Sequence, residues 1–203
     1  MSASDDVDKP LRIFLVRHGE TAWTLSGRFT GTTDIALTGH GEVEAQSLAP
    51  MLGRIPFSHL LSSPRLRARQ TCELAGLSVP VVLDDLAEWD YGIYEGTHSM
   101  TIHKQRQGWN IFSDGCPEGE MPSDVVARAD RLIAHLETLQ GNVAVFSHGH
   151  FSRAIAVRWI GLPILQAHHF LLGTASVSIL SLDARHGNVR VIELWNKSSA
   201  APE

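Results

Sequence analysis

The chain has 203 residues, of which 43% are hydrophobic and 19% are charged, and its formal net charge is −5. A chain of this length buries roughly 70% of its extended surface on folding, so one core can form without disulfides or a metal. The apolar content excludes disordered and collagen-like proteins. The acidic charge argues against a nucleic-acid partner, since binding phosphate backbones needs a basic face. No apolar run reaches the ~18 residues of a membrane span, so no membrane partner is expected.

The two cysteines, Cys72 and Cys116, are too few for a disulfide framework or a four-ligand zinc site. Residues 1–10 lack the basic and apolar regions of a secretory signal. We therefore expect a cytoplasmic protein with a tail at 1–10, a single domain at 11–196 and a second tail at 197–203. Arginine supplies 14 of the 17 cations. Its planar guanidinium suits small anions such as phosphate, although a GC-rich genome explains the same count.

Strands alternate with helices in the first half of the chain. A buried strand is predicted at 11–16, followed by a polar loop at 17–21. A helix that starts near Thr38 is predicted at 38–52, from apolar residues spaced for one face. A short strand at 59–62 leads into a helix that ends near Leu74, with Ser63 as its N-cap and Pro64 in its first turn. A further strand is predicted at 79–83.

The second half predicts the same alternation. The segment 84–120 is weakly periodic and rich in aromatic residues, which is typical of a functional loop or a lid. Helices are predicted at 123–140 and 151–160, a buried strand at 142–147 and a hairpin from 176–182 and 189–195. This order predicts an α/β fold: a three-layer α/β/α sandwich with a mostly parallel central sheet and antiparallel strands at one edge.

Polar loops follow two of the predicted strands. Arg17 and His18 come directly after the first strand, and His148 follows the strand at 142–147. Ligands of α/β sheets bind at the carboxyl ends of strands. The start of the helix after Ser63 adds N–H groups and a dipole that favour an anion. The three loops together predict an oxyanion pocket, although a single histidine at a strand end is more often structural than catalytic.

The arginines of the helix after Ser63, and Glu88, each have two interpretations, one functional and one structural. Arg65 and Arg69 share a helical face while Arg67 points elsewhere, so at most one face of this helix serves the pocket. Glu88 precedes Trp89, and a carboxylate desolvated by a large apolar ring is a typical general acid. An exposed loop carboxylate is the alternative interpretation of Glu88.

Four motifs resemble, in order, those of the histidine phosphatase superfamily, in its phosphoglycerate-mutase-like branch, over about residues 11–180. The first consists of residues 15–23, 27–31 and 37–39, and the others lie at 62–71, 86–96 and 145–149. The resemblance places the arginine of the second motif at Arg67 rather than Arg65. Thr24 and Thr30 stand where the family commonly has Asn and Gln, so contacts around the phosphate and the leaving group differ. Segments 87–96, 115–120 and 148–153 are most similar to a subgroup with fungal sedoheptulose bisphosphatase and bacterial acid phosphatases.

The resemblance implies a metal-independent phosphomonoesterase that acts on a small phosphate ester, such as a sugar phosphate or bisphosphate, without a cofactor. In this interpretation His18 attacks phosphorus and forms a phosphohistidine, while Arg17, Arg67 and His148 hold the phosphoryl oxygens. Glu88 protonates the leaving oxygen and then activates water. The residues expected to bind substrate are Arg28, Thr30, Gly31, Trp23, Tyr91, Gly149 and His150. The expected mouth of the pocket also includes Trp89, Tyr94 and Arg153.

Three alternatives stay open. A mutase must shield its phosphoenzyme from water, and the family's mutases carry a longer basic insertion where only 20 residues separate Arg67 from Glu88 here. A metallophosphoesterase would use His148, His150 and His168–His169, but no acidic metal-binding motif accompanies them. A non-catalytic phospho-ligand binding module would lack at least one residue of the core set. The sequence also leaves open a homodimer.

Overall fold

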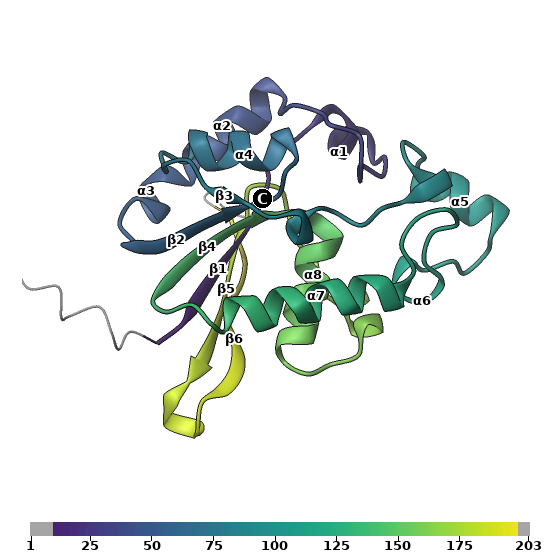
Figure 1. Ribbon diagram of the computed structural model, residues 1–203. Helices are drawn as coiled ribbons and strands as arrows, with labels where there is room; N and C mark the ends of the chain where they lie inside the picture. Colours follow the sequence, from purple (N-terminus) through teal and green to yellow (C-terminus); the bar gives the residue numbers. More distant parts are fainter. Residues whose placement is uncertain (1–9, 199–203) are drawn as a thin grey trace, which may run out of the picture.

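The computed structural model describes residues 10–198, and a six-stranded sheet lies at its centre (Figure 1). Its strands are β1 (Arg12–Arg17), β2 (Phe57–Ser62), β3 (Val81–Val82), β4 (Asn142–Ser147), β5 (Val177–Asp183) and β6 (Val189–Lys197). Their order across the sheet is β3-β2-β4-β1-β5-β6. The first four strands in that order are parallel neighbours, whereas β5 and β6 each run antiparallel to the strand before them. The predicted mixed sheet with an antiparallel edge is confirmed.

Helices cover both faces of this sheet. The α-helices are α1 (Ala22–Ser26), α2 (Gly39–Ser47), α3 (Ala49–Leu52), α4 (Leu66–Leu74), α5 (Ser99–Gln105), α6 (Ile111–Asp114), α7 (Pro122–Leu136) and α8 (Gly149–Trp159). Short 3-10 helices are η1 (Asp84–Leu86), η2 (Gly92–Tyr94), η3 (Ile164–His169) and η4 (Ala184–His186). Helices α2, α3 and α4 lie on one side of the sheet, and α7 and α8 on the other (Figure 1). This is the predicted three-layer sandwich.

The central strands bury side chains on both faces. In β1, Ile13 and Leu15 join the core cluster that contains residues of α7 and α8, while Phe14 and Val16 join the cluster that contains residues of α3 and α4. This division follows from the two-residue period of a strand, and β4 divides its side chains in the same way. Strands buried on both faces read as continuous apolar runs, which is why the sequence predicts β1 and β4 so well.

The helix predicted at 38–52 is two helices in the structure. Helix α2 ends at Ser47 and α3 begins at Ala49. Pro50 stands in the first turn of α3, where it has no N–H for the carbonyl one turn earlier, so a continuous helix cannot pass it. Thr38 caps α2, and its hydroxyl accepts a hydrogen bond from the Gly41 N–H at 3.0 Å.

The predicted start of α4 at Ser63 is wrong. The N-cap is Arg65, whose backbone is extended, and the first helical residue is Leu66. The Leu66 N–H donates to the Asp34 carboxylate at 2.7 Å, so a carboxylate from a distant loop does the work of a local cap. The hydroxyl of Ser63 instead hydrogen-bonds His148 Nε2.

Several other boundaries differ from the prediction. Helix α1, which begins with a capping box between Thr21 and Thr24, was not predicted, and α5 and α6 lie within the segment predicted to be irregular. Helix α7 ends at Leu136 rather than Gln140, and Lys197 is the last residue of β6 rather than the start of a tail. The rest of the predicted tails, 1–9 and 199–203, lies outside the described residues.

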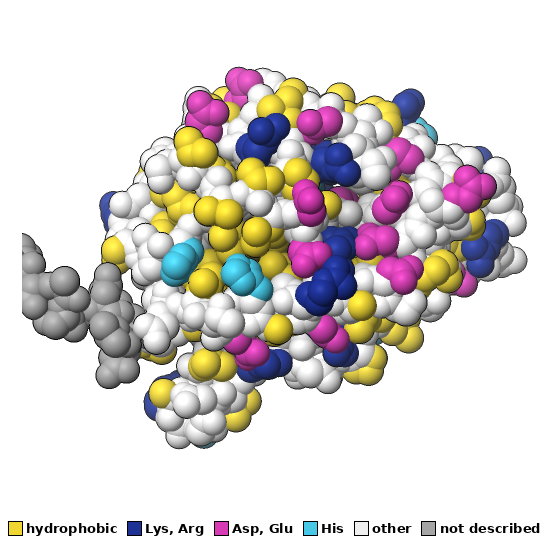
Figure 2. Space-filling model, viewed as in Figure 1, with side chains coloured by type: hydrophobic (Ala, Val, Ile, Leu, Met, Phe, Trp, Pro, Cys, Tyr) yellow, Lys and Arg dark blue, Asp and Glu magenta, His cyan; other side chains and the backbone are white. Residues whose placement is uncertain are grey.

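The fold brings two polar loops to one edge of the sheet. Arg17 at the end of β1 pairs with Ser147 at the end of β4, so His18 and His148 follow from adjacent positions. No helix within residues 10–198 is long and apolar enough to cross a membrane. Acidic and basic side chains lie interspersed on the face seen in Figure 2.

Phe146 provides a test of the packing around the central strand. Its side chain is fully buried in β4, so Phe146→Ala should lower the free energy of unfolding by about 3–5 kcal/mol through the cavity it leaves. Val79 is 94% exposed, and Val79→Ala is the control, with an expected change below about 0.5 kcal/mol. Urea unfolding followed by circular dichroism measures both, and equal small losses would contradict a tightly packed core at β4.

Candidate active site

A pocket of about 320 Å³ opens where β1 and β4 end. It is lined by Arg17, His18, Thr24, Gly27, Arg28, Phe29, Thr30, Glu88, Tyr91, Ser99, Gly149, His150, Arg153 and Leu172. These residues come from loops far apart in the sequence. A larger groove of about 960 Å³ lies between α2, α3 and the end of β6, but it contains none of the predicted site residues.

His18 is held as a neutral imidazole. Its Nδ1 lies 2.7 Å from the Gly19 carbonyl oxygen, which only accepts hydrogen bonds, so the proton is on Nδ1 and Nε2 keeps its lone pair. Burial lowers the pKa of His18 well below its usual value, and the charges of Arg67 and Arg17 lower it further. His18 therefore presents a nucleophilic nitrogen in a positively charged environment.

Glycine at position 19 is required by a close approach of two loops. A Cβ there would lie 2.4 Å from the Gly41 carbonyl oxygen, too near for any other residue. The Gly19 N–H donates to the hydroxyl of Thr71 on α4 at 3.1 Å. These contacts fix the carbonyl that orients the ring of His18.

His148 is bound on both sides. Arg67 Nε donates to its Nδ1 at 3.2 Å, and since Nε–H can only donate, the ring proton is on Nε2, which donates to the Ser63 hydroxyl at 2.7 Å. Arg67 and His148 are both fully buried. Burial lowers the pKa of His148 well below its usual value, and the charge of Arg67 adds to this. His148 is therefore neutral as well.

Arg67 also binds the backbone of the loop before α2. Its Nη1 donates to the Thr33 carbonyl at 3.0 Å, and its Nη2 donates to the carbonyls of Thr30 at 2.9 Å and Gly31 at 3.2 Å. Neither Arg67 nor His148 is among the residues that line the pocket. The ring of His148 lies behind that of His18, with centroids 5.2 Å apart. Both residues thus lie outside the pocket lining and next to His18, with most of their polar atoms engaged by protein.

Arg17 faces the pocket with a buried donor. Its Nη1 donates to the Leu172 carbonyl, while its Nε is buried without a hydrogen-bond partner among residues 10–198. Nε lies 3.4 Å from the position that a Cβ on Gly149 would occupy. Burial lowers the pKa of Arg17, although the charge of Glu88 opposes this. A buried unpaired N–H on a cationic group beside a pocket suits an anionic oxygen.

Glu88 is bound by three backbone N–H groups. Oε1 accepts from Trp89 at 2.9 Å and from Phe151 at 2.8 Å, and Oε2 accepts from His150 at 3.0 Å. Two of these donors belong to the first turn of α8, where the helix dipole favours a negative charge. The ring of Trp89 instead packs against Phe112 in the core. The helix end, and not the neighbouring ring expected from the sequence, sets the position of the carboxylate.

Tyr91 and His150 form a polar pair in the pocket wall. The Tyr91 hydroxyl lies 2.7 Å from His150 Nδ1. Burial lowers the pKa of His150 to about 4 and raises the pKa of Tyr91 well above its usual value. Tyr91 therefore donates to a neutral ring. Phe29 and Phe112 pack beside His150, with ring centroids 5.8 Å and 5.6 Å away.

Two arginines lie at the pocket besides Arg17. Arg28 Nε donates to His98 Nε2 at 3.3 Å. Arg153 donates to the Ala167 carbonyl at 2.9 Å and to the His168 carbonyl at 3.1 Å. Each guanidinium has more donors than these bonds use, so both are able to bind an anionic or hydroxyl-rich ligand.

Four residues expected at the substrate lie elsewhere. Trp23 packs over Gly96, and Gly31 is buried where a Cβ would be 2.4 Å from the Trp89 carbonyl oxygen. Trp89 and Tyr94 belong to the hydrophobic core. Aromatic residues beside a motif are as useful for packing as for binding, and sequence does not distinguish the two uses.

The structure also adds residues that the sequence did not indicate. Phe29, Ser99 and Leu172 line the pocket. Leu172 arrives from the loop before β5 and contributes through its carbonyl as well, for which no side-chain signal exists. Within residues 10–198, no group of three or more His, Cys, Asp or Glu side chains is placed to hold a metal ion.

Comparison with known proteins identifies the family. The model of the histidine phosphatase superfamily (branch 1) matches residues 13–197. This chain belongs to the histidine phosphatase superfamily. The prediction made from its four motifs is therefore confirmed, as is the phosphatase class.

Relatives of this histidine phosphatase include proteins named as phosphatases. It is 42% identical to an acid phosphatase of Mycobacterium tuberculosis over 180 residues, and these residues make up 87% of this chain and 88% of the relative. It is 36% identical to sedoheptulose 1,7-bisphosphatase of Saccharomyces cerevisiae, over 75% of this chain and 69% of that one. A solved open reading frame product of Mycobacterium tuberculosis superposes with a TM-score of 0.88 at 40% identity, over 93% of this chain and 98% of that one.

The neutral state of His18 predicts how stability depends on pH. The pKa of His18 is lower in the folded state than its unfolded value of 6.5, so the unfolded chain binds more protons below about pH 6.5. The stability that this group contributes is present above pH 6.5 and is lost as the pH falls, by up to about 1.4 kcal/mol per pH unit. His18→Asn should therefore flatten the decline in unfolding free energy between pH 6.5 and 5.

Urea unfolding at several pH values measures this slope in the wild type and the variant. Burial also lowers the pKa values of His148 and His150, which contribute to the slope of both proteins, so the difference between the two slopes reports on His18. An identical slope in the two proteins would contradict a neutral His18.

Proposed function

We propose that this phosphatase hydrolyses phosphomonoesters of a small metabolite through a phosphohistidine intermediate on His18. The observation that carries the proposal is a neutral imidazole whose Nδ1 is bound to the Gly19 carbonyl and whose neighbours include the buried Arg67 and the partly buried Arg17. A neutral ring keeps the lone pair that attack requires, and the cations offset the charge of the phosphoryl group.

In the first step, His18 Nε2 attacks phosphorus and the bond from phosphorus to the ester oxygen breaks. The unpaired Nε–H of Arg17 binds a phosphoryl oxygen, while Arg67 and His148 support His18 from outside the pocket lining. Glu88 donates a proton to the leaving oxygen. Loss of a positively charged donor to the phosphoryl group, such as Arg17, typically lowers the rate by roughly 10²- to 10³-fold.

In the second step, water attacks the phosphohistidine. Glu88, now a carboxylate, takes a proton from the water as its oxygen bonds to phosphorus, and the bond from phosphorus to Nε2 breaks. Inorganic phosphate leaves, and His18 regains its lone pair. The α8 N–H groups that bind Glu88 keep the same carboxyl in place for both proton transfers.

The substrate that this pocket fits best is a sugar phosphate or bisphosphate. Its volume of about 320 Å³ lies at the lower end for small-molecule sites. Arg28 and Arg153 supply donors beyond those near His18, which suits a second phosphate or several hydroxyls. The similarity to an acid phosphatase and a sedoheptulose bisphosphatase supports this class.

Phosphate release in excess chelator from a panel of sugar phosphates, bisphosphates and phosphoglycerates tests the mechanism. We expect His18→Ala to lower release by at least about 10³-fold, because it removes the nucleophile. His59 is exposed on β2, and His59→Ala is the matched control that should retain activity.

Release that the chelator abolishes would contradict the proposal in favour of a metal site, and release that survives His18→Ala would contradict the assigned nucleophile. No release by the wild type from any ester, combined with phosphoryl exchange once a phosphorylated primer is added, would instead establish a mutase.

Arg153 tests the substrate class. Arg153→Met should lower kcat/KM for a sugar bisphosphate by about 10-fold or more, because a hydrogen bond to a charged group contributes roughly 1.5–3 kcal/mol. The effect on a sugar monophosphate should be smaller. Arg158→Met is the control, since Arg158 lies on the same helix and pairs with Asp130 away from the pocket. Equal losses on the two substrates would contradict a role in binding a second phosphate.

A further inference from the structure

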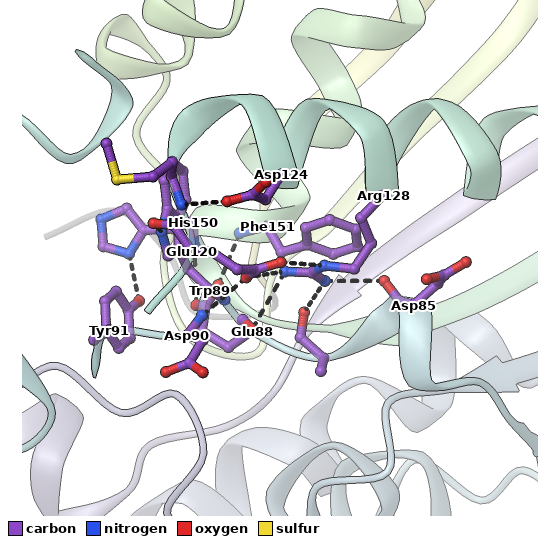
Figure 3. A network of polar contacts seen from close by, with 12 residues as sticks. Asp85, Glu88, Trp89, Asp90, Tyr91, Glu120, Asp124, Arg128, His150 and Phe151 are labelled. Atoms are coloured by element: carbon purple, nitrogen blue, oxygen red, sulfur yellow. Dashed lines mark hydrogen bonds and ion pairs between the residues drawn. The ribbon is translucent and has the colours of Figure 1, made fainter. Parts of the chain in front are cut away.

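A buried ion pair lies behind the carboxylate side of the pocket. Arg128 on α7 binds Glu120 through two hydrogen bonds, Nε to Oε1 at 2.8 Å and Nη2 to Oε2 at 2.7 Å (Figure 3). Their side chains are only 10% and 21% exposed, and neither lines the pocket. The motifs of the sequence gave neither residue a role.

The remaining donors of Arg128 bind the backbone that leads to Glu88. Nη1 donates to the carbonyls of Asp85 at 3.0 Å and Ala87 at 2.7 Å, and Nη2 approaches the carbonyl of Glu88 at 3.4 Å (Figure 3). This segment contains only the single-turn helix η1, so it has little regular hydrogen bonding of its own. One guanidinium therefore binds three backbone carbonyls of this segment.

Glu120 binds the same segment just beyond Glu88. Its Oε2 accepts from the Asp90 N–H at 2.9 Å, its own N–H donates to the Asp90 carbonyl at 2.9 Å, and its carbonyl accepts from Trp89 Nε1 at 2.8 Å. The ion pair thus holds residues 85–90 from both sides of Glu88.

Arg128 also touches the helix end that binds the Glu88 side chain. Its guanidinium lies over the Phe151 ring, 3.8 Å from the centroid, and the Phe151 N–H donates to Glu88. The same side chain therefore contacts both the backbone of Glu88 and a residue that binds its carboxylate.

Burying an ion pair costs desolvation free energy, and two apolar side chains of similar volume often stabilise a fold equally well. What apolar side chains cannot do is bind five acceptors in fixed directions. We propose that Arg128 and Glu120 are positioning residues that hold the Glu88 carboxyl at the leaving-group oxygen. This inference rests on the proposed function, in which Glu88 is the acid.

A positioning role predicts dependence on the leaving group. An alkyl alcohol must be protonated as it departs, whereas p-nitrophenolate departs without a proton. For each substrate, kcat/KM covers the steps up to departure of this group. Displacing the acid therefore lowers kcat/KM for an alkyl phosphate and leaves that for p-nitrophenyl phosphate nearly unchanged, while general damage to the fold lowers both.

The experiment compares glycerol phosphate with p-nitrophenyl phosphate in wild type, Arg128→Lys, Glu120→Gln and Glu88→Gln. We expect Arg128→Lys and Glu120→Gln to lower kcat/KM for glycerol phosphate by about 10- to 100-fold, the size of effect that follows small displacements of a catalytic group. Both should change the p-nitrophenyl phosphate value little, and Glu88→Gln should show the same selectivity more strongly. Arg158→Met is the matched control, because Arg158 pairs with Asp130 on the same helix as Arg128, outside the segment 85–90.

Equal losses on the two substrates, or no loss on either, would overturn the positioning role. If neither Arg128→Lys nor Glu120→Gln folds, as judged by circular dichroism, the pair is purely structural and the inference fails as well. The proposed function fails separately, if Glu88→Gln shows no leaving-group selectivity or if His18→Ala keeps the wild-type activity.

Discussion

The site depends first on the buried guanidinium of Arg67. It binds His148 and the carbonyls of Thr30, Gly31 and Thr33, and so joins α4, the end of β4 and the loop before α2. Burial lowers the pKa values of His18 and His148 most, and the charge of Arg67 lowers both further. One cation therefore both fixes the loops around His18 and adds to the effect of burial that keeps His18 neutral. The hydrogen bonds of Arg67 take the place of bonds to water at these buried acceptors. Loss of the guanidinium would therefore leave the acceptors unpaired.

The acid and the nucleophile of the proposed mechanism are prepared by different means. His18 takes its tautomer from a single carbonyl, that of Gly19, and its neutrality from burial and nearby cations. Glu88 is bound by the start of α8, while Arg128 contacts its carbonyl and Glu120 accepts from the nearby Asp90 N–H. The two groups line one pocket but are held by different residues, so each can be altered by substitutions that leave the other in place.

The sequence predicted what depends on pattern and missed what depends on tertiary contacts. Strands β1 and β4 were predicted because burial on both faces produces continuous apolar runs, and their ends place two motifs at one sheet edge. Ser63 was misassigned as a cap because Asp34, distant in sequence, caps α4 instead. Trp89 was misassigned to the mouth because its ring serves the core. Arg128 and Leu172 had no signal, since their contacts involve backbone carbonyls.

The most direct test of the central claim, that His18 is a neutral nucleophile with its proton on Nδ1, is ¹⁵N nuclear magnetic resonance of the histidine-labelled protein. Signals are assigned to His18 by their loss in His18→Asn. We expect a protonated Nδ1 and an unprotonated Nε2 throughout pH 5–7, because burial and two arginines hold the pKa of this ring well below its usual value. A doubly protonated ring at pH 7, or a proton on Nε2, would contradict the claim.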